Sequence, residues 1–227
     1  KDGETEVTIF VEDAAGNSAD ATFVVSYDGP EEPEEPKEKM SRISGIDRYQ
    51  TALEISSEGW ESADTVIIAR GNDFADALAG VPFAYAEEAP ILLTSTNVLS
   101  AGVLTEIERL GATKAIILGG KAAVSEAVQK ELTNAGIAVE RASGVDRFAT
   151  AAAIADLVAP NGSDEVVIAN GLDFPDALSV ASHAAKVGTP ILLTRKSSVP
   201  VETAIAIGKL GAKKTVVVGG TAVVSDA

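Results

Sequence analysis

One sequence pattern occurs twice in this chain, with its two copies about 100 residues apart. The matching segments, in pairs, are 44–49 with 143–148, 71–78 with 171–178, 90–94 with 190–194, 110–112 with 210–212, and 119–120 with 219–220. A repeat of this length is a whole compact module, because the units of solenoid proteins are only about 20 to 50 residues long. Duplicated modules more often serve avidity than catalysis.

The composition favours a core of small aliphatic residues. Hydrophobic residues make up 46% of the chain and aromatic residues only 4%, which is typical of buried parallel strands covered by helices. The net charge is −16: residues 1–40 have 12 acids and 3 bases, and residues 41–227 have 22 acids and 15 bases. We therefore expect no nucleic-acid partner, since a basic stripe is absent. We also expect no membrane insertion, since no run of 18 apolar residues occurs.

Residues 1–27 predict a β-hairpin. The segments 5–12 and 21–27 are rich in β-branched residues, and turn-forming residues separate them. Because two strands alone are marginally stable, we expect the hairpin to belong to a larger β-sandwich. It resembles the last two strands of a bacterial immunoglobulin-like (Ig-like) domain. Residues 28–40 predict an extended acidic linker, with proline at every third position.

Residues 41–140 and 141–227 each predict alternating strands and helices, hence right-handed βαβ crossovers and a parallel sheet. Strands are expected at 41–44, 65–69, 90–94, 114–118, 165–169, 190–194 and 214–218. Helices are expected at 47–58, 74–87, 99–110, 126–134, 146–158, 174–187 and 199–210. The predicted fold is therefore two tandem three-layer α/β modules of Rossmann-like or flavodoxin-like type. The second module is expected to be truncated at Ala227, before the counterpart of the helix at 126–134.

Two pairs of aspartates follow buried strands at helix N-termini: Asp73 with Asp76, and Asp173 with Asp176. Open α/β sheets place ligand sites there. Such a pair could hold Mg²⁺ or act as acid and base, but aspartate is also a good N-cap and suits the helix dipole. Both interpretations stay open. The phenylalanine between each pair is expected to anchor the core.

Arginine occurs in the first turn of the first helix of each module, as Asp47-Arg48 and Asp146-Arg147. The aspartates suit the helix N-terminus, but the dipole disfavours a cation there. Each arginine therefore needs an ion pair or an anionic ligand. His183 corresponds to Phe83, so chemistry common to both modules cannot depend on it. Nucleotide-binding and hydrolase motifs are absent, and we predict no cofactor and no resident metal.

Four motifs in order resemble the bacterial cell-wall-binding type 2 repeat: R-x-S-G-x-D-R-[YF]-x-T-A, G-x-D-F-x-D-A-L, P-I-L-L-T and G-G-x-x-x-V-S. They occur at 42–52, 71–78, 90–94 and 119–125, and again in the second copy, which breaks off after Ser225. The resemblance implies Rossmann-like modules that usually come in threes with pseudo-threefold symmetry. A third module would then lie beyond Ala227 or come from another chain.

The resemblance implies secretion and non-covalent anchoring to anionic polymers, such as teichoic acid, in the Gram-positive cell wall, as in S-layer proteins. It associates the Ile-Leu-Leu segments with anchoring and with the module interface, here Ile91, Leu92, Leu93, Ile191, Leu192 and Leu193. The cations expected to contact the polymer are Arg48, Arg70, Lys121, Arg147, Arg195 and Lys196. Two alternatives to this non-catalytic role remain: a metal-dependent enzyme using Asp-x-x-Asp at a Rossmann-like or toprim-like site, and a purely structural module-pairing domain.

Overall fold

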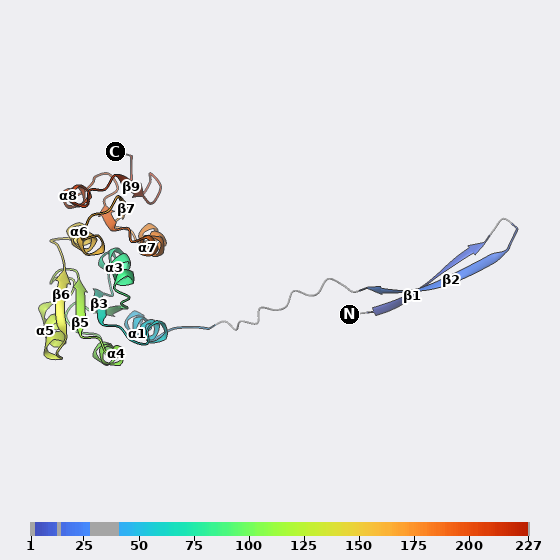
Figure 1. The fold of residues 1–227 in the computed structure, drawn as a ribbon, viewed down its shortest axis with the longest axis horizontal. Helices are drawn as coiled ribbons and strands as arrows, with labels where there is room; N and C mark the ends of the chain where they lie inside the picture. Colours follow the sequence, from blue (N-terminus) through green and yellow to red (C-terminus); the bar gives the residue numbers. More distant parts are fainter. Residues whose placement is uncertain (1–2, 13–14, 28–40, 227) are drawn as a thin grey trace. The chain divides into compact units, whose positions relative to one another are not determined.

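The computed structural model describes residues 3–12, 15–27 and 41–226, and the chain divides into two units, Lys1–Arg42 and Ile43–Ala227 (Figure 1). The predicted linker at 28–40 lies outside the described residues. In the first unit, β1 (Gly3–Glu12) pairs antiparallel with β2 (Ser18–Tyr27), so the predicted hairpin is confirmed.

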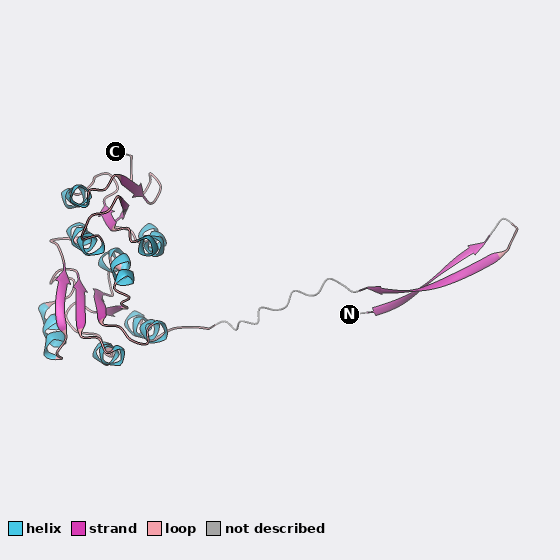
Figure 2. Cartoon of the chain, viewed as in Figure 1, coloured by secondary structure: helices cyan, strands magenta, loops and turns pink. Residues whose placement is uncertain are grey.

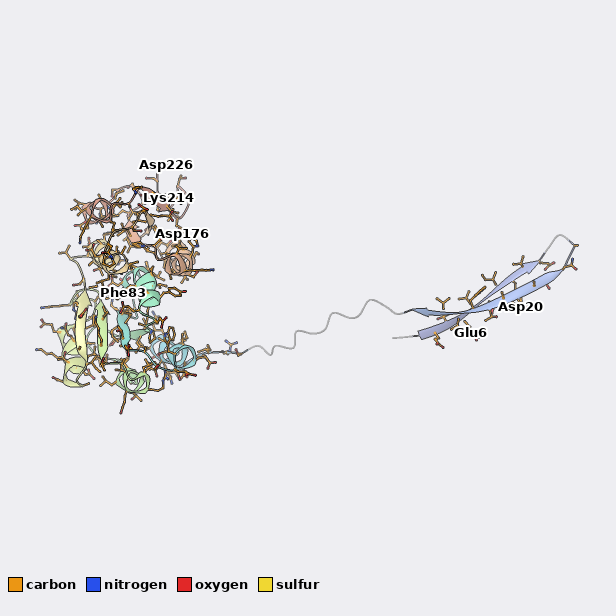
Figure 3. All side chains as sticks on the ribbon, in the orientation of Figure 1. Glu6, Asp20, Phe83, Asp176, Lys214 and Asp226 are labelled. Atoms are coloured by element: carbon orange, nitrogen blue, oxygen red, sulfur yellow. The ribbon has the colours of Figure 1, made fainter. Side chains whose placement is uncertain are left out.

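The hairpin has one apolar and one mainly polar face. Val7 stands opposite Phe23, and Ile9 lies two residues along on the same face. Glu6 and Asp20 belong to the other face (Figure 3). Phe23 is 54% exposed, so the apolar face has no cover among the described residues.

The second unit contains parallel sheets, one for each copy of the repeat (Figure 2). In spatial order, the first sheet consists of β4 (Ile91–Thr94), β3 (Thr65–Arg70), β5 (Lys114–Leu118) and β6 (Ala138–Ala142). The second consists of β8 (Ile191–Thr194), β7 (Glu165–Asn170) and β9 (Lys214–Val217). In each sheet the strand that comes first in the chain, β3 or β7, lies between the next two strands of the chain. This is the flavodoxin-like order.

Helices cover the sheets. Those of the first copy are α1 (Arg48–Gly59), α2 (Ala75–Ala79), α3 (Val81–Ala86), α4 (Val103–Leu110) and α5 (Glu126–Asn134). Those of the second are α6 (Arg147–Val158), α7 (Pro175–Val187) and α8 (Val201–Leu210). The sequence explains several ends: Asp47 and Asp146 accept backbone hydrogen bonds as N-caps, and Gly111 and Gly211 adopt positive φ at the C-caps. In the described residues no helix is both long and apolar enough to cross a membrane.

The two modules share one hydrophobic core. Alternate residues of β3 face opposite sides: Ile67 belongs to the shared core, and Ile68 to a core confined to the first module. Ile191 and Leu193 join Ile67 in the shared core. Helix α3 packs against α6 and α7, and Figure 1 shows it between the first sheet and those two helices. The predicted tandem three-layer α/β fold is therefore confirmed.

Some predicted elements differ from the structure. Residues 41–44 form no strand, and no strand in the described part of the chain pairs with them. The helix expected at 74–87 divides at Gly80 into α2 and α3, with Pro82 in the first turn of α3. Helix α4 starts at Val103 rather than near 99, because Gly102 precedes it at φ 88°. Of the two phenylalanines expected in the core, Phe74 is partly buried and packs against the shared core, whereas Phe174 is 48% exposed; their rings lie 5.7 Å apart.

Candidate functional site

The strand order creates a crevice at the carboxyl end of the first sheet. The chain passes from β3 to β4 on one side, and β5 then pairs with β3 on the other side. Loops that leave β3 and β5 therefore diverge, which is where open α/β sheets bind ligands. A pocket of about 310 Å³ lies there, lined by residues that follow β3, β5 and β6. We call it the junction pocket, because Gly144–Arg147, which lead into the second module, form one wall.

Charges of both signs line the junction pocket. Its cations are Arg70, Lys121 and Arg147, and its acids are Asp73, Asp76 and Asp146. The Asp73 carboxylate accepts a hydrogen bond of 2.6 Å from Arg70 and one of 3.1 Å from Arg147. One acid of the predicted Asp-x-x-Asp pair is thus neutralised by two arginines, one from each module. Arg147 therefore holds the modules together as well as lining the pocket.

Asp76, the second acid of this pair, is partly buried. Burial raises the pKa of the Asp76 carboxyl, and the negative charge of Asp73 adds to this, while Arg70 and Arg147 act in the opposite direction. A Cβ atom on Gly119 would lie 2.5 Å from Asp76 Oδ2, so only glycine leaves room for this carboxylate. Close packing of the backbone against an acid therefore explains why glycine occupies position 119.

The two first-turn arginines have one contact in common and differ in a second. Arg147 Nη1 donates to the Gly171 carbonyl at 2.7 Å, and Arg48 Nη1 donates to the equivalent Gly71 carbonyl at 2.9 Å. Arg147 also forms an ion pair with Asp73. Arg48 has no acidic partner among the described residues. It lines a second pocket of about 380 Å³, together with the Phe74 and Phe174 side chains.

The other predicted cations lie apart: Lys121 lines the junction pocket, and Arg195 and Lys196 follow β8 of the second sheet. Lys121 forms an ion pair of 2.5 Å with Glu126 and remains largely exposed. The Arg195 guanidinium lies 4.5 Å from the centre of the Phe148 ring, a cation–π contact. The exposed Lys196 side chain makes no ion pair with the described residues.

The Ile-Leu-Leu segments form β4 and β8, so their residues alternate between two environments. Leu92 and Leu192 are fully buried and face away from the shared core. Ile191 and Leu193 lie in the shared core between the modules. Ile91 is only half-buried and lines an apolar groove beside α1, whereas Leu93 lines the second pocket.

The second Asp-x-x-Asp pair, Asp173 and Asp176, also has one more exposed and one more buried member. Asp173 is exposed and accepts a hydrogen bond from the Phe174 backbone N–H. Asp176 is half-buried against Gly219, as Asp76 is against Gly119. In the second module, therefore, Asp176 lies beside the same glycine turn, whereas Asp173 forms no ion pair with a described residue.

The model of the cell wall binding domain 2 family, CWB2, matches residues 42–129 and 141–227. The chain belongs to the CWB2 family. It is 38% identical over 185 residues to N-acetylmuramoyl-L-alanine amidase LytC of Bacillus subtilis, covering 82% of this chain and 37% of LytC. It is 35% identical to the amidase enhancer of the same organism, covering 70% of this chain and 22% of that protein.

Among solved structures, Cwp6 from Clostridium difficile superimposes with a TM-score of 0.75 at 29% identity, covering 91% of this chain and 34% of Cwp6. The aligned part of this chain covers between 22% and 37% of the length of these three relatives. The family and these relatives identify residues 42–227 as cell-wall-binding modules.

The CWB2 motif contains one arginine that the sequence reasoning left without a role. Arg141 Nη1 donates to the carbonyls of Gly119 at 2.7 Å and Val124 at 2.9 Å, and its Nη2 donates to Gln129 Oε1 at 2.9 Å. It therefore fixes the loop at 119–124, of which residues 120–123 line the junction pocket. The sequence does mark this residue, because an arginine, Arg42, occupies the same motif position in the first copy of the repeat.

Proposed function

We propose that this CWB2 chain anchors a secreted protein non-covalently to anionic polymers, such as teichoic acid, of a Gram-positive cell wall, and that it does so by binding rather than by catalysis. The observation that carries the proposal is the junction pocket, where Arg70, Lys121 and Arg147 converge at the topological switch point of an otherwise acidic protein. Each module would contact the polymer weakly, and several modules bound to one polymer would together supply avidity.

Lys121 is the cation we expect to contact the polymer most directly. Its side chain is 71% exposed, and its partner Glu126 is also largely exposed, so an anion can displace this pair at little cost. Arg70 and Arg147 are engaged by Asp73 and provide a positive rim without being released. Arg48, which lines the second pocket, and Arg195 and Lys196, which follow β8, are the further cations that we expect to contact the polymer.

The ion pairs of Asp73 weigh against the enzyme alternative. A carboxylate held by two arginines has no free charge for a metal or for proton transfer, which leaves Asp76 alone at that position. The ion pair between Arg147 and Asp73 favours the second alternative, a purely structural pairing of modules. A wall-binding assay distinguishes anchoring from mere pairing of modules, because cell walls would not retain a domain that only pairs modules.

The test compares retention of the full chain on purified Gram-positive walls before and after the anionic polymers are stripped. Lys121→Glu should reduce retention on intact walls several-fold and weaken its dependence on salt. The matched control is Lys213→Glu: Lys213 is also exposed and ion-paired, with Asp164, but it lies before β9, at the opposite end of the sheet. Unchanged retention on stripped walls, or equal effects of the two variants, would contradict the proposal.

We further propose that a third CWB2 module, from the same or another chain, covers the exposed face of α1. Ile55 is 48% exposed and, with Trp60, Tyr85 and Ile91, lines an apolar groove of about 610 Å³. Its counterpart Ile154 is fully buried in the core shared between the modules. A chain carrying a third repeat should bind walls more tightly than the two-module chain, and equal binding would contradict this part of the proposal.

A further inference from the structure

The two most exposed large hydrophobic side chains in the described part of the chain occupy equivalent positions in the two modules. Ile46 is 94% exposed and Val145 is 92% exposed, and each lies between the glycine and the aspartate of the S-G-x-D-R motif. Single exposed aliphatic residues are common on protein surfaces and need no explanation. Recurrence of such high exposure at one motif position does need one, because a side chain without a role could be polar in either copy.

The start of α6 does not use the Val145 side chain. Val145 directly precedes Asp146, the N-cap of the helix, and a hydrophobic residue in that position often packs against the fourth residue of the helix. Here the fourth residue is Thr150, whose hydroxyl accepts a hydrogen bond of 3.1 Å from the Gly144 N–H. A hydrogen bond therefore takes the place of the usual apolar contact, and the valine side chain is left to solvent.

The turn that presents this side chain is tightly packed in both modules. A Cβ atom on Gly144 would lie 2.2 Å from the Ala149 Cβ, and one on Gly45 would lie 2.5 Å from the Gln50 Cβ. The Gly45 N–H also donates to Thr51 Oγ1 at 3.0 Å, which repeats the hydrogen bond of the second module. Each aliphatic side chain is thus held on a preformed turn, which lowers the entropy cost of a contact made there.

Val145 lies between two hollows of the surface. One is the junction pocket, and the other is a groove of about 430 Å³ between α6 and α8; Gly144 and Val145 line both. We call the second hollow the α6–α8 groove. Its apolar lining consists mainly of small side chains: Ala149, Ala152, Ala153, Ile205 and Ala206. Ile46 lines the corresponding groove of the first module, of about 470 Å³, beside α1. A ligand held in the junction pocket can therefore continue over Val145 into the α6–α8 groove.

The charges of the two grooves indicate which part of a ligand they can take. In the α6–α8 groove, Asp156 and Lys209 form an ion pair of 2.6 Å, which leaves the charge of Glu202. The groove of the first module is lined by Asp47 and Glu54 and, among the described residues, by no lysine or arginine. Both grooves therefore repel a phosphate or a carboxylate. Their apolar floor and polar rim suit an uncharged sugar ring, which has a face of C–H groups and an edge of hydroxyls.

We propose that Ile46 and Val145 bind uncharged sugar rings of the wall polymer, and that the anionic group next to the ring on Val145 is held at Lys121 in the junction pocket. The ring lies on the aliphatic side chain and along the groove, where the polar residues of the rim bond to its hydroxyls. This inference rests on the proposed anchoring function and adds the chemical class of the ligand, a polymer that carries both neutral sugars and anionic groups.

The experiment measures binding of the full chain to two soluble polymers of equal length: poly(glycerol phosphate), which has no sugar rings, and the same polymer with glucosyl substituents. The double variant Ile46→Ser, Val145→Ser should bind the glucosylated polymer about tenfold more weakly and the plain polymer equally well, because only apolar contact is removed. Its salt dependence should stay unchanged, whereas Lys121→Glu should reduce the salt dependence with both polymers. The matched control is Val187→Ser: Val187 is 55% exposed at the end of α7, before β8, at the opposite end of the sheet.

Weaker binding of the double variant to the glucosylated polymer alone would support the inference. Equal losses with the two polymers, or equal effects of the double variant and Val187→Ser, would overturn it and leave the anchoring function intact. Binding of neither polymer would also overturn it, and retention on intact and stripped walls would then decide separately whether anchoring stands. All these side chains are exposed, so the variants should keep the Tm of the wild type.

Discussion

Arg147 and Asp73 belong to different modules and form an ion pair, with 3.1 Å between Nη2 and Oδ2. The same guanidinium donates to the Gly171 carbonyl of its own module, and the same carboxylate accepts from Arg70 of its own module. The side chains of Arg147 and Asp73 are 30% and 21% exposed, so solvent screens the pair only in part. This arrangement resolves why arginine occupies the first turn of α6, where the helix dipole alone disfavours it.

Removing Arg147 should therefore cost more stability than removing Arg48. Arg147→Ala loses a carbonyl hydrogen bond and the ion pair, whereas Arg48→Ala loses only the equivalent carbonyl hydrogen bond. A double-mutant cycle of Arg147→Ala with Asp73→Ala should give a coupling free energy of about 0.5–1.5 kcal/mol in chemical denaturation. No coupling, or equal losses for the two arginine variants, would mean that the pair adds nothing to the module interface.

The shared core predicts a second contrast between equivalent residues. Ile154 is fully buried between the modules, and Ile55 is 48% exposed. Ile154→Ala should lower the free energy of unfolding by about 2–5 kcal/mol, because it leaves a cavity in a packed core. Ile55→Ala should cost under about 1 kcal/mol in this chain, since solvent already reaches the site. Denaturant titrations of both variants measure the contrast, which fails if the two losses are similar.

Much of this architecture could be predicted because the repeat fixes the order of strands and helices. The strands around residues 65–70 and 114–118 are continuous apolar runs, and Asp47 and Asp146 mark helix starts, so these elements were predicted within a residue or two. Residues 41–44 have the same motif as a segment that joins a sheet, yet they form no strand. Local sequence favours an extended segment there, but pairing needs a neighbour that the sequence pattern cannot supply.

The sequence predicted where the site lies in the fold, but not which of its charged side chains form ion pairs with one another. Strand ends and helix starts indicated Asp73, Asp76 and Arg147 as candidates. Whether an arginine meets an aspartate of the neighbouring module depends on how the two modules pack, which local patterns do not encode. Phe174 was expected in the core because its motif matches that of Phe74, but among the described residues only Phe74 of this pair packs against the shared core, and Phe174 is 48% exposed.

Gly119 should tolerate alanine worse than another glycine of the same backbone conformation. Gly136, at φ 86°, has no atom within 4 Å of an added Cβ, so Gly136→Ala should cost only the backbone strain of about 1–2 kcal/mol. At Gly119, φ 104°, the added Cβ also meets Asp76 Oδ2 at 2.5 Å and the Ala123 Cβ at 2.8 Å. Gly119→Ala should therefore cost above about 3 kcal/mol in denaturation experiments. Similar losses for both variants would show that the loop moves aside without strain.

The carboxyl of Asp76 should contribute more to stability in acid than at neutral pH. Burial, with the charge of Asp73, raises the pKa of Asp76 in the folded state, so its contribution to stability is greatest below the unfolded value of about 3.9 and falls as pH rises through the folded pKa. Asp76→Asn removes the buried charge and should raise Tm by a few degrees at pH 7. The gain should disappear near pH 3, where the wild-type carboxyl is protonated in both states.

Asp164 provides the control of opposite sign. A hydrogen bond from Lys213 lowers the pKa of Asp164, so its contribution to stability is present above the unfolded pKa and is lost as pH falls through the folded pKa. Asp164→Asn should therefore lower Tm slightly at pH 7 and leave it unchanged in strong acid. Thermal melts of both variants and the wild type between pH 3 and pH 8 give the comparison. A Tm of Asp76→Asn that falls below the wild type at pH 7 would mean that Arg70 and Arg147 outweigh burial, and that the ionised carboxylate stabilises the junction.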